Sequence, residues 1–332
     1  MNIALIILAA GKGTRMQSEL PKVLHEVAGA PMLVHAMRAG RALDPKRTII
    51  IAGHGFEAVS AAARAEDPEV EVVRQEAQLG TGHAVDQARA ALSDFDGTVI
   101  VLYGDCPLIQ SRTLEELSAT LSDSAVSVLG FEAKDPARYG RLITDGDKLK
   151  RIVEFKDASP AERAVSLCNS GVMAASAGLL FDLLSEIDAN NASGELYLTD
   201  VIGKAVARGL PCTAVRCAER ETLGVNSRVE LMQAEKEFQN LRRTEALEDG
   251  VTMPAPETVH FSYDTVIGRD TIIEQNVVFG PGVTVESGAQ IRAFSHLEGA
   301  HVSRGCIIGP YARLRPGAEL AEDVKFGNFV EI

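Results

Sequence analysis

A glycine-rich loop near the start of the chain has the composition of a phosphate-binding turn. The loop reads Leu8-Ala-Ala-Gly-Lys-Gly-Thr-Arg-Met16 and directly follows an apolar run. Its small residues let the backbone approach phosphates closely, so that N–H groups can donate hydrogen bonds to them. It lacks both the Walker A spacing and the third glycine of a dinucleotide-binding fingerprint. Arg15 and Lys22 add cations that suit a polyphosphate gaining charge in a transition state, although a tight turn with solvated basic residues is the simpler alternative.

A second segment, Gln75–His83, reads Q-E-A-Q-L-G-T-G-H and joins a strand-like run to a helix-like run. Its backbone groups and the Gln75 amide offer the donors and acceptors that read the edge of a base. An ordinary loop with a threonine cap at the helix start fits the residues equally well. His83 is expected to be a helix residue and not a catalyst.

A third segment, Tyr103-Gly-Asp-Cys-Pro107, places Asp105 at the carboxyl end of an apolar strand, where open α/β sheets bind their ligands. One carboxylate there suits Mg²⁺, which takes few protein oxygens and completes its shell with phosphate oxygens and water. The alternative is that Asp105 only forms the turn. Cys106 is expected to pack in the core, because no histidine partner is evident.

Other polar residues border strands or helix starts, and each of them alone is more often structural than functional. This weaker set is Tyr139, Gly140, Arg141, Glu154, Asn169, Tyr197, Thr199 and Asn226.

Strand-like and helix-like patterns alternate up to residue 226, which predicts an α/β domain with a mixed, mainly parallel, Rossmann-like sheet. Short aliphatic runs predict buried strands at Ile3–Leu8, Thr48–Ala52, Val70–Val73, Thr98–Tyr103 and Ala125–Phe131. Amphipathic patterns predict helices at Met32–Leu43, Gly82–Leu92 and Thr113–Leu121. The segment Arg141–Lys156 is typical of a hairpin that turns at Asp145-Gly146.

A long helical pattern over Ser227–Leu247 predicts a linker helix within residues 227–250, after a first domain of residues 1–226. Residues 251–332 form the third part. There, aliphatic residues recur every sixth position, with one step that is a residue short, which is typical of hexapeptide repeats in a parallel β-helix. The repeating positions are Ile267, Ile273, Phe279, Val285, Ile291, Leu297, Val302, Ile308, Leu314, Leu320, Phe326 and Ile332. No capping element follows the last repeat, so we expect an incomplete β-helix, either truncated or covered at its open end.

The composition excludes several classes of protein. The 332 residues carry a formal net charge of −13, which gives no electrostatic footprint for nucleic acid. No apolar run approaches the length of a membrane helix, so no integral membrane segment is expected. The five cysteines are odd in number and lack a C-x-x-C pair, which indicates reduced thiols and a cytoplasmic location.

The sequence resembles the bifunctional N-acetylglucosamine-1-phosphate uridylyltransferase / glucosamine-1-phosphate acetyltransferase family of bacteria. The resemblance spans the chain in the ordered motifs L-A-A-G-K-G-T-R-M, P-K-V-L-H, Q-L-G-T-G-H-A, Y-G-D-C-P-L, Y-G-R, I-V-E-F-K-D-A, G-E-L-Y-L-T-D and G-V-N-S-R. It implies that the N-terminal domain joins UTP and N-acetylglucosamine 1-phosphate into UDP-N-acetylglucosamine and pyrophosphate. This product supplies cell-envelope precursors for peptidoglycan and lipopolysaccharide. It also implies Mg²⁺ as cofactor, a left-handed β-helix and a homotrimer.

The resemblance assigns roles position by position. The nucleotide is lined by Leu8, Ala9, Ala10 and Gly11. Uracil is read by Gln75, Gly80 and Thr81, and the sugar of the nucleotide lies against Tyr103 and Gly104. For the reaction, Arg15 and Lys22 hold the phosphates, and Asp105 and Asn226 bind Mg²⁺. For the acceptor sugar, Gly140, Glu154 and Asn169 hold it, with Tyr197 and Thr199 as further candidates.

The family continues beyond residue 332 into the rest of an acetyl-CoA site. Arg315, in A-R-L-R-P-G, matches a position that contacts the acetyl acceptor, but nothing else of that site has a match. We therefore expect uridylyltransferase activity and no acetyltransferase activity from this chain. Three alternatives stay open: a pyrophosphorylase for another sugar or nucleotide, such as glucose 1-phosphate with UTP or dTTP; a catalytically silent sensor of nucleotide sugars; and an acetyltransferase with a dependent N-terminal domain.

Overall fold

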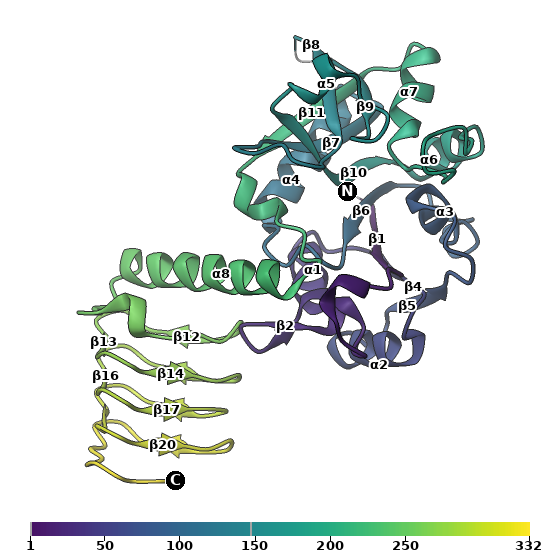
Figure 1. Cartoon of the computed structure of the whole chain (residues 1–332). Helices are drawn as coiled ribbons and strands as arrows, with labels where there is room; N and C mark the ends of the chain where they lie inside the picture. The colour runs from purple at the N-terminus through teal and green to yellow at the C-terminus, as the bar shows by residue number, and fades with distance from the viewer. Residues whose placement is uncertain (1, 147) are drawn as a thin grey trace. The chain divides into compact units, whose positions relative to one another are not determined.

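The computed structural model describes residues 2–146 and 148–332, which divide into two compact units (Figure 1). The first unit comprises Pro31–Glu230 and the residues that precede Glu26. The second comprises Leu231–Ile332 together with the short segment Glu26–Ala30, which has no counterpart in the division made from the sequence.

A nine-stranded sheet is the framework of the first unit, in the order β5-β4-β1-β6-β10-β7-β11-β9-β8. Its strands are β1 (Ile3–Ala9), β4 (Arg47–Ala52), β5 (Glu71–Arg74), β6 (Thr98–Tyr103), β7 (Val126–Glu132), β8 (Arg141–Asp145), β9 (Lys148–Val153), β10 (Leu167–Ser176) and β11 (Cys212–Cys217). Strands β5, β4, β1 and β6 are parallel to one another, and so are β7 and β11. Strand β10 runs antiparallel to both β6 and β7. The prediction of a mixed, mainly parallel sheet is confirmed.

Strand β1 shows why the aliphatic runs become central strands. All seven of its residues are buried, and they alternate between the two faces of the sheet. Ile3, Leu5 and Ile7 belong to one core cluster, whereas Ala4 and Ile6 belong to the other. A strand covered on both faces needs apolar side chains at every position. Because neighbouring strands are parallel, the carboxyl ends of β1, β4, β5 and β6 lie at one edge of the sheet.

The helices include one at each predicted amphipathic pattern, with ends shifted by about two residues in two cases and by more in a third. They are α1 (Met32–Arg41), α2 (Phe56–Glu66), α3 (Thr81–Asp86), α4 (Ser111–Ala119), α5 (Pro160–Arg163), α6 (Ala177–Leu184), α7 (Asp200–Ala207) and α8 (Arg228–Glu248). Short 3₁₀ turns are η1 (Thr14–Met16), η2 (Lys22–Leu24), η3 (Thr120–Ser122), η4 (Glu219–Thr222) and η5 (Pro256–Thr258). The expected helix to Leu92 is wrong in extent, because the chain beyond α3 continues as turns. There the Ala88 N–H donates to the Val85 carbonyl at 3.0 Å, a bond of i to i−3 type.

The second unit contains a parallel β-helix of two-residue strands. They are β12 (Val266–Ile267), β13 (Ile272–Ile273), β14 (Val278–Phe279), β15 (Thr284–Val285), β16 (Gln290–Ile291), β17 (His296–Leu297), β18 (His301–Val302), β19 (Ile307–Ile308), β20 (Arg313–Leu314) and β21 (Glu319–Leu320). They form three parallel sheets, one per face. Each predicted repeat position from Ile267 to Leu320 is the second residue of a strand, and these side chains build the core of the unit. The step that is one residue short is absorbed within one coil, since Ile272 pairs with Gln290 but Gln290 pairs with Ile307.

One further coil precedes the regular repeats. Thr252 pairs with Ile272 and His260 pairs with Val278, and Phe261 stacks on Phe279 with ring centroids 5.5 Å apart. A two-residue strand β2 (Glu26–Val27) and strand β3 (Ala30–Pro31) flank a turn that also belongs here. Its Ala28 N–H donates to Glu235 Oε2 at 2.6 Å, which explains why this segment packs with the second unit.

No helix among the described residues combines the length and apolarity needed to span a bilayer.

Truncation of a β-helix core residue tests this packing. Ile291 is fully buried (0% exposed), whereas Ile272 points outward and is 41% exposed. Ile291→Ala is expected to lower the free energy of unfolding by about 2–5 kcal/mol in urea denaturation, because it leaves a cavity. Ile272→Ala is the matched control and should change it by less than about 1 kcal/mol. Equal losses from the two variants would contradict the assigned interior.

Candidate active site

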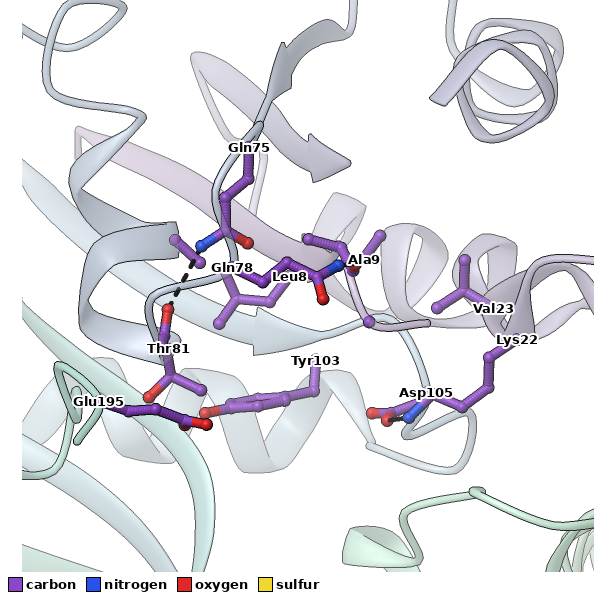
Figure 2. A pocket seen from close by; sticks show the side chains of 14 residues that line it. Leu8, Ala9, Lys22, Val23, Gln75, Gln78, Thr81, Tyr103, Asp105 and Glu195 are labelled. Atoms are coloured by element: carbon purple, nitrogen blue, oxygen red, sulfur yellow. Dashed lines mark hydrogen bonds and ion pairs between the residues drawn. The ribbon is translucent and has the colours of Figure 1, made fainter. Parts of the chain in front are cut away.

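A cavity of about 320 Å³ opens at the carboxyl edge of the parallel strands in the first unit (Figure 2). The three segments singled out in the sequence meet there. Of the predicted residues, the lining includes Leu8, Ala9, Ala10, Gly11, Lys22, Gln75, Gly80, Thr81, Tyr103 and Asp105. Figure 2 shows Lys22 and Asp105 at one end of the cavity and Thr81 and Glu195 at the other, with the Tyr103 ring between them.

The glycine loop brings Lys22 to this cavity by a close approach of the chain to itself. Gly13 has a φ of 61°, and a Cβ atom there would lie 2.6 Å from the Cβ of Lys22. Only glycine fits both the left-handed backbone and the space. Gly104 is anchored beside the loop, because its N–H donates to the Leu8 carbonyl at 3.0 Å.

Lys22 joins two residues that are far away in the sequence. Its Nζ donates to Asp105 Oδ2 and, at 2.9 Å, to Asn226 Oδ1. The Val225 N–H donates to the Asp105 carbonyl at 2.9 Å, which holds the Asn226 segment beside the end of β6. A cation therefore already lies between the carboxylate and amide oxygens that were expected to bind metal. The described residues contain no cluster of three or more histidine, cysteine or acidic side chains suited to a metal.

Cys106 lies next to this group but is buried, and burial is the main cause that raises the pKa of its thiol well above the usual value. A thiol with so high a pKa stays protonated and is a poor nucleophile. Its position agrees with the expected role in packing.

Gln75 is fixed at the back of the cavity by its neighbours. Its backbone N–H donates to the Ala52 carbonyl at 2.8 Å, and its Nε2 contacts the Gly80 carbonyl at 3.3 Å and His83 Nδ1 at 3.0 Å. His83 lies in α3 and supports the Gln75 amide from outside the cavity. Thr81 does not cap α3 with its side chain, since its hydroxyl accepts from the Leu198 N–H at 3.0 Å.

Sequence reasoning missed Gln78 and Glu195, which also line the cavity. Gln78 Nε2 donates to the Ala10 carbonyl at 2.6 Å and so ties the second segment to the glycine loop. Backbone bonds hold the Glu195 segment nearby, because the Leu196 N–H donates to the Leu79 carbonyl at 2.8 Å. Gln78 stands within the quoted motif Q-L-G-T-G-H-A and Glu195 within G-E-L-Y-L-T-D, but the residue types alone give neither side chain a role.

The residues expected to hold the acceptor sugar gather around Glu154. Thr199 Oγ1 donates to Glu154 Oε1 at 3.1 Å, and a Cβ on Gly140 would lie 3.4 Å from the same carboxylate. The Asn169 N–H donates to the Gly140 carbonyl at 2.9 Å. Tyr197 joins Glu154 and Thr199 in the lining of a second cavity of about 520 Å³. Burial, followed by Asp200 and Asp157, raises the pKa of Glu154 and outweighs the opposing bond from Thr199.

The absence of a side chain at Gly171 leaves room for the Tyr103 ring. A Cβ on Gly171, whose φ is 90°, would lie 2.5 Å from Cε2 of the Tyr103 ring. Burial is also the main cause that raises the pKa of the Tyr103 phenol, so this group stays a neutral donor.

Three basic residues behave differently from one another. Arg15 is exposed in η1, does not line the cavity, and makes no hydrogen bond or ion pair with the part of the chain that the structure describes. Arg141 is buried (2% exposed), and its guanidinium donates to backbone carbonyls that include Ala137 at 3.3 Å, which indicates a structural role. Arg315 lies in the second unit, where its side chain forms an ion pair with Glu331.

Comparisons with known proteins agree with both units. Residues 5–175 match the model of the MobA-like NTP transferase domain, and residues 264–299 match the bacterial transferase hexapeptide repeat. The chain is 62% identical over 332 residues to the bifunctional protein GlmU of Roseobacter denitrificans and 65% identical to that of Ruegeria pomeroyi. In both cases the alignment covers 100% of this chain and 74% of the relative.

Solved structures with lower identity share the fold. A UDP-glucose pyrophosphorylase bound to UDP-glucose aligns with a TM-score of 0.59 at 17% identity, over 73% of this chain and 100% of that chain. A putative glucose-1-phosphate thymidylyltransferase from Bacillus anthracis aligns with a TM-score of 0.57 at 23% identity, over 71% and 94%. The first unit is therefore a nucleotidyltransferase fold, and the hexapeptide match agrees with the expected left-handed β-helix.

The raised pKa of Glu154 predicts a pH-dependent cost to stability. The unfolded carboxyl titrates near 4.5, so below that pH both states are protonated, and the cost appears as pH rises through the higher folded pKa. Glu154→Gln keeps an acceptor for Thr199 without the charge. It should raise the thermal midpoint at about pH 7.5 and leave it unchanged at about pH 4. Glu195→Gln, at an exposed carboxylate, is the control, and an equal rise at both pH values for Glu154→Gln would refute the assignment.

Proposed function

The chain belongs to the family of the bifunctional GlmU proteins, and we propose that the cavity of its first unit is where that family's uridylyltransferase reaction takes place. The reaction makes UDP-N-acetylglucosamine and pyrophosphate from UTP and N-acetylglucosamine 1-phosphate. The observation that carries the placement is the convergence of Lys22, Asp105 and Asn226 beside the glycine loop. The product is a precursor for the bacterial cell envelope.

The chemistry needs alignment more than it needs acid–base catalysis. A phosphate oxygen of the sugar phosphate attacks the α-phosphorus of UTP in line, and the bond from that phosphorus to the bridging oxygen of the β-phosphate breaks. Pyrophosphate leaves with the electron pair. Because the attacking oxygen is already anionic, no strong general base is required, and the protein must bring two polyanions together in line.

The nucleotide would lie along the glycine loop. Backbone groups of Leu8 to Gly11 would face its base and phosphates, with the Gln75 amide and the Gly80–Thr81 backbone at the edge of uracil. His83 and the Ala52 carbonyl already hold Gln75 in one orientation, which supports recognition of the base by preformed groups. Tyr103 and Gly104 would pack against the nucleotide sugar.

The phosphates would lie at the Lys22 end of the cavity. The ammonium group would exchange its bond to Asp105 for bonds to phosphate oxygens and stabilise the charge that passes to pyrophosphate. Arg15 is exposed and has no partner among the described residues, so its guanidinium is available to the outer phosphates.

The oxygens of Asp105 and Asn226 fit a divalent cation, because the Lys22 ammonium already bridges them. We infer that they hold Mg²⁺, which favours two protein oxygens plus phosphate oxygens and water. When bound, the ion would neutralise charge on the α-phosphate and the leaving group. The acceptor sugar would lie near Glu154, Asn169 and Gly140, with Thr199 and Tyr197 beside them.

The five cysteines are all free, which supports a cytoplasmic location. The hexapeptide repeats support an oligomer, and we propose a homotrimer formed through the β-helix. Analytical ultracentrifugation should give the mass of three chains, and a monomer alone at micromolar protein would contradict the trimer.

A panel of substrates tests the proposed function directly. Pyrophosphate release is expected from UTP with N-acetylglucosamine 1-phosphate, and at a much lower rate from dTTP, CTP or glucose 1-phosphate. A preference for glucose 1-phosphate would favour the alternative pyrophosphorylase. No release from any pair would favour a silent sensor of nucleotide sugars.

Asp105→Asn tests the placement of the metal. It preserves the shape of the side chain but removes its charge, and kcat should fall by about 10²–10³-fold, because the cation loses its only carboxylate among the proposed ligands. Asp86→Asn is the matched control, since Asp86 pairs with Arg89 on the surface of α3. Turnover of Asp105→Asn at the wild-type rate would refute the metal assignment.

A further inference from the structure

His25 is a buried histidine that the reaction itself does not use. Its residue is 5% exposed, and it directly follows the turn η2 that carries Lys22. Its backbone is fixed at both ends, because the His25 N–H donates to the Lys22 carbonyl at 3.2 Å and its carbonyl accepts from the Met32 N–H at 3.0 Å. The motif P-K-V-L-H thus ends on a side chain that has no place in the cavity lining.

The imidazole contacts the segment that carries the other site residue. Arg228 lies two residues after Asn226, and its Nη1 is 3.1 Å from His25 Nδ1. Three residues earlier on η2, Lys22 Nζ donates to Asn226 Oδ1 at 2.9 Å. The two segments are therefore cross-linked at two neighbouring points. Asn226 is also held from its own side, since its N–H donates to Glu230 Oε2 at 2.7 Å.

The two cross-links differ in what binding would do to them. A polyphosphate that drew the Lys22 ammonium away would break the bond to Asn226, whereas the contact between His25 and Arg228, which lies outside the cavity lining, would remain. That contact would then hold the backbone of Lys22 in place while its side chain moves.

We propose that His25 is a positioning residue: as a neutral acceptor for the Arg228 guanidinium, it holds the turn that carries Lys22 against the segment that carries Asn226. The inference rests on the function proposed above for Lys22. A guanidinium has no acceptor capacity, so the ring nitrogen must bring the lone pair, and an imidazolium has none to offer. Protonation of His25 would therefore replace an attractive contact by repulsion between two cations.

The surroundings keep the ring neutral at neutral pH. Burial, followed by the charge of Arg228, lowers the pKa of His25 below its ordinary value of 6.5, and the Leu20 backbone opposes this shift. Arg228 is the charged group that acts on the ring. Since the folded pKa is depressed, the contact is intact above pH 6.5 and is lost as the pH falls through the folded pKa.

Two variants separate positioning from folding. Arg228→Met removes the donor from an exposed side chain, and kcat for pyrophosphate release should fall roughly ten- to a hundredfold, with the KM for UTP within about twofold of wild type. Its thermal midpoint should stay within about 2 °C of wild type. His25→Asn keeps an acceptor that does not titrate, so its kcat at neutral pH should lie within about threefold of wild type. The double variant should be no slower than Arg228→Met alone, because the two residues form one contact.

The pH profile supplies a readout that a merely structural role would not move. Substrate phosphates titrate in the same window, but they do so equally for both enzymes. The ratio of wild-type kcat to that of His25→Asn should therefore fall as the pH drops below 6.5. His301→Asn, on an exposed histidine of the β-helix paired with Glu286, is the matched control and should follow wild type. Arg112→Met is the control for the arginine change, since this side chain is 79% exposed and paired with Glu116.

Each outcome of these experiments either supports or overturns the positioning role of His25. A kcat of Arg228→Met within twofold of wild type, or a pH-independent ratio, overturns the positioning role. Hydrogen–deuterium exchange adds a readout without turnover, because the amides of Lys22–His25 should exchange faster in Arg228→Met than in Arg112→Met. If the wild-type chain releases no pyrophosphate, the proposed function fails. The exchange result then decides alone whether His25 holds the turn, and equal exchange in the two variants overturns it.

Discussion

The Lys22 ammonium lies between the Asp105 carboxylate and the Asn226 amide oxygen, and the rest of the site is arranged around this contact. It joins residues that are 83 and 204 positions apart. The three residues come from different parts of the first unit: Lys22 from a 3₁₀ turn after the glycine loop, Asp105 from the end of β6, and Asn226 from the segment before α8. A charge held with little exposure to water needs partners, so these three segments must close on one another for the unit to fold well.

The sheet makes this contact possible, and the sequence predicts the sheet well. A strand buried on both faces must be apolar at every position, so β1 and β6 are visible as aliphatic runs with nearly their observed ends. Parallel strands place their carboxyl ends at one edge, and that rule alone sets Asp105 beside the glycine loop. The repeats of the β-helix are equally visible, because each interior residue recurs at a fixed spacing and each coil pairs only with its neighbours.

Contacts without a local pattern could not be predicted from spacing. Only the resemblance to a family predicts a role for Asn226 and Glu154. The sequence predicts no role for Gln78, Glu195 or the pair of His25 and Arg228. Their positions depend on backbone bonds between distant segments, such as that from the Leu196 N–H to the Leu79 carbonyl. The contacts that hold the start of α3 have the same origin. The Leu198 N–H and the Leu196 carbonyl make hydrogen bonds to the first turn of α3, and the amphipathic pattern of the sequence does not predict such contacts.

Burial gives the site a second organising constraint, which acts through protonation. It raises the pKa of Tyr103, Cys106 and Glu154 and lowers that of His25, so in every case the neutral form is favoured. Among the charged residues that line the first cavity, Lys22 and Asp105 are largely shielded from water and pair with each other, whereas Glu195 is exposed. In the function proposed above, a polyphosphate would bind at the Lys22 end of the cavity, where the ammonium would leave the Asp105 carboxylate to bind it. In the proposed function, movement of Lys22 would leave the oxygens of Asp105 and Asn226 without their cation, so binding of the nucleotide at this end would itself favour the arrival of a metal ion.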